Sequence, residues 1–62
     1  MCESNAYIHK EGGDELLLEN VTFIRPEGGK LVMTSLLGDE VVIDAEILEI
    51  DLMAHKIVLV KR

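Results

Sequence analysis

Apolar and polar residues alternate along most of the chain, in short runs separated by glycine-rich breaks. The breaks are Gly12-Gly13-Asp14, residues 26–29 and Gly38-Asp39, and their composition is typical of turns. The runs between them are rich in valine, isoleucine and leucine, which favour strands. The pattern predicts six strands, at residues 2–9, 15–25, 30–37, 40–44, 46–52 and 57–61.

Two local features of these strands stand out. Asn20 interrupts the alternation of the second strand, which predicts a bulge or bend there. The last two strands read as a hairpin in which Leu52 and Ile57 face each other across the loop 53–56. A loop of four residues commonly needs one with positive φ, and His55 tolerates that conformation better than its neighbours.

The length and this pattern set the fold class. A chain of 62 residues makes one domain, residues 1–62. We therefore expect a small all-β domain, an antiparallel sheet or partly open barrel of about six short strands, SH3-like in size. A chain this short buries only about 60% of its unfolded surface and usually needs a metal, disulfides or a partner chain. Its one cysteine excludes a disulfide within the chain.

The alternation yields more apolar positions than one small core needs, since hydrophobic residues make up 48% of the chain. One set can fill a core: Val21, Phe23, Leu31, Met33, Val41, Ile43, Leu48, Ile50, Leu52, Ile57 and Leu59. A second set points the other way: Leu17, Ile24, Val32, Leu36, Val42, Ile47, Val58 and Val60. Soluble proteins usually hide such a face in an interface, which predicts a homodimer with two-fold symmetry. The alternative is a strongly bent sheet that buries both faces within one chain.

Charge limits the classes of partner. Twelve acidic against six basic residues give a net charge of −6, which repels nucleic-acid phosphates. Tyr7 and Phe23 are the only aromatic residues in the sequence, which is too few for a surface on which bases stack. We therefore expect no nucleic-acid partner. No apolar run approaches the roughly 20 residues that span a bilayer, and there is no signal-like leader. A free thiol favours a reducing compartment, hence the cytoplasm.

The chemistry-bearing residue that stands out is Cys2, directly behind the first methionine. A thiol there lies close to the α-amino group and the first backbone amides. Sulfur and nitrogen donors bound in a plane suit Ni(II) or Cu(II), whereas Mg²⁺ or Ca²⁺ prefer oxygen. Two other interpretations remain: the position arises by chance, or the cysteine packs as a small apolar residue.

Other candidates are weaker. His9 lies seven residues from Cys2, over ~20 Å in an extended strand, so the two cannot share a site within one chain. Both His9 and His55 read more simply as solvent-facing residues near turns. Met33 reads as core and Met53 as part of a turn, rather than as thioether ligands.

Catalysis has little support in the sequence. Neither Ser4 nor Ser35 stands at a recognised spacing from a base. The paired carboxylates Glu40 and Asp44, or Glu49 and Asp51, lie on strand faces that are ordinarily solvated. A chain this short also offers no enclosed pocket of the ~300 Å³ that a small substrate needs. We expect a protein that is not an enzyme.

The chain resembles the CooT family of small accessory proteins for nickel insertion into carbon monoxide dehydrogenase. The resemblance covers nearly the whole chain and rests on the opening Met1-Cys2-Glu3, the Gly-Gly break and the ending Ile50-Asp51-Leu52 with Ile57-Val58-Leu59. It implies a cytoplasmic, dimeric, all-β protein that binds Ni(II) through Cys2. Its partner would be carbon monoxide dehydrogenase or the nickel-insertion machinery of that enzyme.

That implication agrees with the donors available near Cys2. The amine of Met1, the amide nitrogen of Cys2 and its thiolate can form two fused chelate rings. The same cysteine of a second chain can fill a remaining position, so we expect one ion at a dimer two-fold. His55 departs from the family, in which glycine often occupies that hairpin, and this leaves open whether the histidine adds a ligand. The alternatives are a protein-interaction adaptor, or an SH3- or Sm-like nucleic-acid module, with an incidental Cys2.

Overall fold

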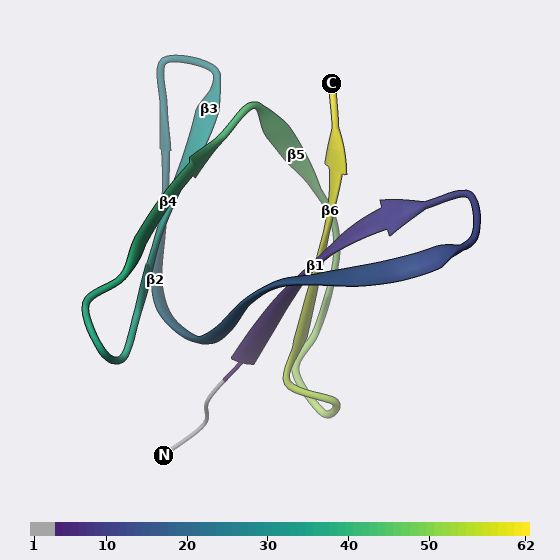
Figure 1. The fold of residues 1–62 in the computed structure, drawn as a ribbon, viewed down its shortest axis with the longest axis horizontal. Helices are drawn as coiled ribbons and strands as arrows, with labels where there is room; N and C mark the ends of the chain where they lie inside the picture. The colour runs from purple at the N-terminus through teal and green to yellow at the C-terminus, as the bar shows by residue number, and fades with distance from the viewer. Residues whose placement is uncertain (1–3) are drawn as a thin grey trace.

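Six strands form one continuous sheet that curls without closing, as the computed structural model shows (Figure 1). The structure describes residues 4–62. The strands are β1 (Ser4–Lys10), β2 (Gly13–Glu27), β3 (Lys30–Ser35), β4 (Glu40–Ile43), β5 (Ala45–Asp51) and β6 (Lys56–Lys61). These bounds confirm the predicted all-β class and, within a few residues, the positions of the predicted strands. The described residues contain no helix long and apolar enough to cross a membrane.

The strand order is β4-β3-β2-β1-β6-β5, so β4 and β5 are the two edges of the sheet. Four pairs of consecutive strands are antiparallel, as hairpins with short turns are: β1–β2, β2–β3, β3–β4 and β5–β6. The exception is β1, which pairs parallel with β6 and so joins the two ends of the described chain. Single residue Asp44 connects the edge strands, and β3 contacts β5 across the fold. The sheet is therefore an open, strongly bent barrel.

The core lies inside this bend. Met33 and Leu59 are fully buried, and β1 contributes Ala6 and Ile8 beside them. The remaining buried members are Val21, Leu31, Ala45 and Ile57, with Leu17, Leu18, Ile24, Val41 and Ile43 packed against them. Met33 is core and Met53, in the loop after β5, is exposed, as the sequence predicted.

Part of the predicted core is wrong. Phe23 is 50% exposed, Leu48 53%, Ile50 51% and Leu52 78%. Three of them belong to β5 and the loop after it, where the sheet ends and no further strand covers them. In β5, moreover, Ile47 pairs with Leu59 and Glu49 with Val58, which leaves Leu48 as the extra residue of a bulge. A bulge shifts the alternation by one residue, so the simple periodicity misassigned the faces.

The second apolar set is buried in part and exposed in part. Val32 and Val58 are buried within the single chain, and Leu17 and Ile24 pack against the core. The predicted alternative of a bent sheet that buries both faces thus holds for these four residues. Leu36, Val42 and Ile47 are exposed as predicted.

β2 is irregular where the sequence predicted it. Its register with β1 shifts between the pairs Ser4–Val21 and Ala6–Leu18, and Asn20 between them adopts a φ of 53°. The backbone N–H of Asn20 donates a hydrogen bond of 3.1 Å to Oδ1 of Asn5. Asparagine tolerates this left-handed conformation better than most residues. The bulge lets the 15-residue strand β2 bend and pair with both β1 and β3.

The β5–β6 hairpin is confirmed, with one correction. Its loop spans residues 52–55 between the pair Asp51–Lys56, so Leu52 lies in the loop and does not face Ile57. Oδ1 of Asp51 accepts hydrogen bonds from the backbone N–H groups of Met53 and Ala54, at 3.1 and 3.0 Å. His55 has a φ of 54°, the predicted positive value.

Candidate functional site

The start of β1 lies beside the β5–β6 loop. The backbone N–H of Asn5 donates a 2.9 Å hydrogen bond to the carbonyl oxygen of His55, and Asn5 then pairs with Lys56. Cys2, the predicted metal ligand, lies outside the described residues 4–62. Of the other candidates, His55 is therefore the histidine close to the beginning of the described chain.

His9 occupies the opposite end of β1. Five residues of extended strand, ~17 Å, separate it from Ser4. Its Nδ1 lies 3.0 Å from Oδ1 of Asp14, across the β1–β2 turn, and half of its side chain is exposed. The structure thus keeps the two histidines at different ends of one strand and does not bring them together.

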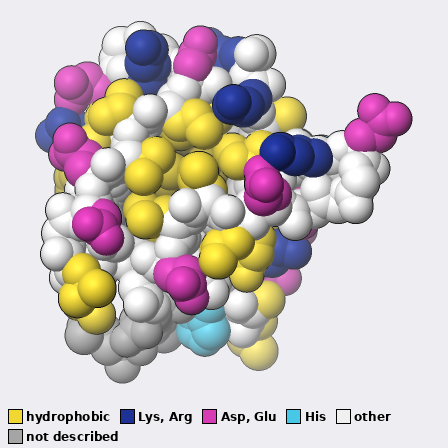
Figure 2. Space-filling model, in the orientation of Figure 1, with side chains coloured by type: hydrophobic (Ala, Val, Ile, Leu, Met, Phe, Trp, Pro, Cys, Tyr) yellow, Lys and Arg dark blue, Asp and Glu magenta, His cyan; other side chains and the backbone are white. Residues whose placement is uncertain are grey.

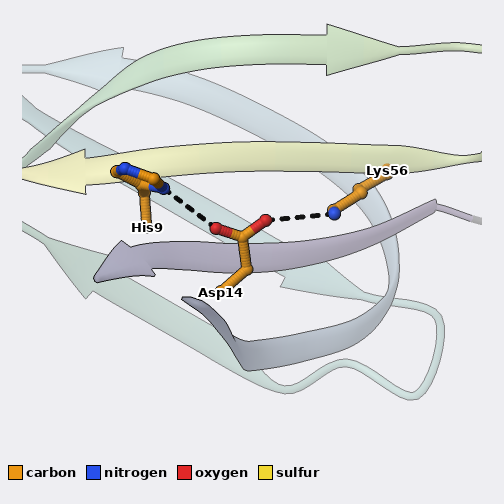
Figure 3. A network of polar contacts seen from close by, with 3 residues as sticks. All are labelled: His9, Asp14 and Lys56. Carbon is orange, nitrogen blue, oxygen red and sulfur yellow. Dashed lines mark hydrogen bonds and ion pairs between the residues drawn. The ribbon is translucent and has the colours of Figure 1, made fainter. Parts of the chain in front are cut away.

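Asp14 joins His9 to a third residue (Figure 3). Its second oxygen, Oδ2, accepts from Nζ of Lys56 at 3.0 Å, and that ammonium group lies 5.1 Å from the ring centre of Tyr7. The hydrogen bond from His9 and the one from Lys56 together hold the pKa of Asp14 below its usual value. The hydrogen bond to Asp14 raises the pKa of Lys56. The sequence did not predict this contact, because it depends on the parallel pairing of β1 with β6.

The described residues do not assemble a metal site on their own. Within residues 4–62 no group of three or more histidine, cysteine, aspartate or glutamate side chains could hold an ion. Asp14 is occupied by His9 and Lys56, and Asp51 by two backbone N–H groups. Asp44 lies 3.5 Å from Nε of Arg62. These carboxylates serve the fold.

Ser35 likewise has a structural role. Ser35 is buried, and its Oγ accepts a 3.1 Å hydrogen bond from the backbone N–H of Asp39. That contact closes the turn after β3. The structure therefore places Ser35 next to a backbone amide, where it stabilises a turn.

A groove that the sequence did not reveal runs between the bend of β2 and the loop that follows β3. Its volume is about 350 Å³, and it is lined by residues 16–20 and by Ser35, Leu37 and Asp39. The groove is open to solvent, so it is not an enclosed pocket of the kind that a small substrate needs. The bulge at Asn20 and the Gly38-Asp39 break were the two sequence signals that meet there.

Comparison with known proteins decides the family. The family model described as CooT, the CO dehydrogenase accessory protein, matches residues 1–60. The chain belongs to the CooT family. It is also similar to a crystal structure from Carboxydothermus hydrogenoformans whose protein is provisionally assigned as CooT. The two share 33% identity over 98% of each chain, with a TM-score of 0.93. No match is found among curated proteins.

Membership in CooT confirms the resemblance found in the sequence and gives the chain an accessory role for CO dehydrogenase. The family is an accessory one and not a catalytic one, which agrees with a protein that is not an enzyme. The matched range, residues 1–60, includes Cys2 and both histidines.

Proposed function

We propose that this CooT protein binds Ni(II) through Cys2, one ion between two chains, and supplies it during maturation of CO dehydrogenase. The observation that carries the proposal is the match of the CooT model to residues 1–60, a range that begins before Cys2. An accessory protein of a nickel enzyme has a reason to handle that metal, and Cys2 is the one thiol of the chain.

The donor set at the start of the chain supports Ni(II) as the cargo. A thiolate, an amine and backbone amide nitrogens are soft-to-borderline donors, and tetragonal nitrogen and sulfur coordination is typical of Ni(II) and Cu(II). The described residues, by contrast, offer no cluster of carboxylates and histidines.

The second chain of the proposed dimer would cover apolar residues at the open side of the barrel. Figure 2 shows apolar side chains gathered in the middle of this face, between β4 and β5, with charged side chains around them. Ile47, Leu48 and Ile50 of edge strand β5 are each about half exposed. Val42 of edge strand β4 is also half exposed, but it alternates with Val41 and Ile43, which pack against the core, so it lies on the outer face. An unpaired edge that carries apolar side chains is a common place for strands of two chains to meet.

The test is a titration of metal-free protein with Ni²⁺, read by thiolate-to-metal charge-transfer absorption and by light scattering. We expect a dimer that takes up one ion per two chains, and a Cys2→Ser variant that stays dimeric without binding tightly. A Leu48→Glu variant, changed at an exposed edge position, should be monomeric. A monomeric wild type, or tight binding by Cys2→Ser, would each contradict the proposal.

A further inference from the structure

The groove beside the bend of β2 is the feature that the nickel site and the dimer leave unexplained. One wall is residues 16–20, where β2 changes direction at Asn20. The other wall is the loop from Ser35 to Asp39, between β3 and β4. Its residues belong to neither edge strand, so the proposed dimer surface does not include it.

Hydrogen bonds fix both walls. The N–H of Leu36 donates to the carbonyl oxygen of Asn20 at 2.8 Å, which ties the loop to the bend. Within the loop, the N–H of Ser35 donates to the carbonyl oxygen of Asp39 at 2.8 Å, and the N–H of Gly38 to that of Ser35 at 3.0 Å. A groove held in this way is already shaped before anything binds, which lowers the entropic cost of binding.

The groove has an apolar interior and an unusually exposed rim. Leu17 and Leu18 are partly buried and pack against the core. Leu37 is 87% exposed, and Leu16 is about half exposed. The turn keeps the Leu37 side chain in solvent, so it makes few apolar contacts within its own chain. Covering it with an apolar side chain of another molecule removes that surface from water.

The charge of the groove is of one sign. Glu19 and Asp39 line it, and no lysine or arginine does. In the part of the chain that the structure describes, neither carboxylate lies within 4 Å of a basic group. Four of the six basic residues are engaged elsewhere, because Lys10, Arg25, Lys56 and Arg62 form ion pairs with Glu15, Glu27, Asp14 and Asp44. Among residues 4–62, the groove thus offers two carboxylates that form no ion pair, beside an apolar floor.

We propose that this groove docks a segment of a partner protein in which lysine or arginine stands next to leucine or a similar apolar side chain. The apolar side chain lies against Leu16 and Leu37, and the basic group meets Glu19 and Asp39. This goes beyond metal binding: it gives the protein a recognition surface that does not depend on Cys2. A polyanion is excluded as the occupant, since the same two carboxylates repel phosphate.

Two capped synthetic peptides serve as probes, one with arginines flanking leucines and one in which glutamates replace the arginines. Amide ¹H–¹⁵N spectra of the metal-free protein report where each peptide binds. We expect the arginine peptide to shift residues 16–20 and 35–39, with an affinity that falls as salt is added, and the glutamate peptide to shift nothing. Shifts centred on β5, or equal binding of both peptides, would overturn the proposal.

Matched variants separate the groove from exposure in general. Leu37→Ser and Glu19→Gln should each lower the affinity for the arginine peptide at least about threefold, which is the usual scale of one exposed contact. Met53→Ser, at a methionine that is 91% exposed, and Glu11→Gln, in the β1–β2 turn, should leave it unchanged. Equal losses in a variant and its control would refute the assignment. Groove shifts that grow with protein concentration alone would show that a second copy occupies it, which also refutes it.

Discussion

Oδ1 of Asn5 accepts a hydrogen bond of 3.1 Å from the backbone N–H of Asn20, fifteen residues along the chain. Asn20 has a φ of 53° and sits at the bulge of β2, so its N–H points out of the regular ladder. The side chain of Asn5 thus accepts the hydrogen bond that a backbone carbonyl of a regular strand pair would otherwise accept. The carbonyl oxygen of the same Asn20 accepts from Leu36, which links the bend to the loop after β3.

Asn5→Ala should therefore lower the free energy of unfolding by ~1–3 kcal/mol, because it leaves a partly buried N–H without an acceptor. Asn20→Gly is the control, since it keeps that N–H and its partner and tolerates positive φ, and it should cost less than about 1 kcal/mol. Urea unfolding followed by circular dichroism gives both values. Equal stability of wild type and Asn5→Ala would show that water replaces the bond.

Met33 and Met53 together provide a test of the core. Met33 is fully buried at the centre of the cluster, and Met53 lies exposed in the β5–β6 loop. Met33→Ala should cost ~2–5 kcal/mol, which is a large part of the stability of a domain this small. Met33→Leu, which nearly conserves volume, should cost less than about 1.5 kcal/mol. Met53→Ala should stay within about 0.5 kcal/mol of wild type. A small loss of stability in Met33→Ala would mean that residues other than Met33 hold the inside of the bent sheet together.

The Asp14 contact predicts a pH dependence. Its pKa is lowered in the folded protein by the hydrogen bonds from His9 and Lys56, so the ionised form stabilises the fold. That stabilisation is complete above the unfolded pKa of about 3.9 and is lost as pH falls through the lower folded value. Lys56, whose pKa is raised, contributes below about pH 10.4 and loses its contribution above that.

Melting temperatures from pH 2 to 8 should accordingly show Asp14→Asn less stable than wild type at neutral pH, with the difference shrinking as the pH falls below the unfolded pKa of about 3.9. Glu11→Gln, in the exposed turn next to it, should follow the wild-type curve. A gap that persists at the lowest pH would mean that Asp14 acts through packing or backbone geometry and not through its charge.

The sequence predicted the elements well and their partners poorly. Turn residues such as Gly38 and the left-handed His55 act locally, so the strands and the last hairpin followed from them. The parallel pairing of β1 with β6 did not follow, because it joins segments some fifty residues apart and periodicity does not name a partner. The Asp14–Lys56 contact was missed for the same reason.

Faces were predicted less well than strands, and bulges explain this. The alternation Leu48-Glu49-Ile50 looks like a core-facing strand, yet Leu48 is the extra residue of a bulge on an edge strand. Each extra residue reverses the face of everything after it. The groove depends on such an event at Asn20, together with a turn from another hairpin. Cys2 was predicted as a ligand because of its position in the chain, and it stays a prediction because it lies outside the described residues.

The proposed nickel site couples metal to protons. A cysteine thiol ionises with a pKa of about 8.5, and the metal takes the thiolate and deprotonated amide nitrogens. Each Ni²⁺ bound should therefore release several protons, and the apparent affinity should fall steeply below about pH 7. A site made only of carboxylates would hold its affinity to about pH 5, where carboxylates are ordinarily still ionised. Calorimetric titration in buffers of different ionisation enthalpy counts the protons. Cys2→Ser should remove both the heat and the proton release, whereas His55→Ala should change affinity less than tenfold. A proton count near zero would rule out thiolate and amide ligation at the start of the chain.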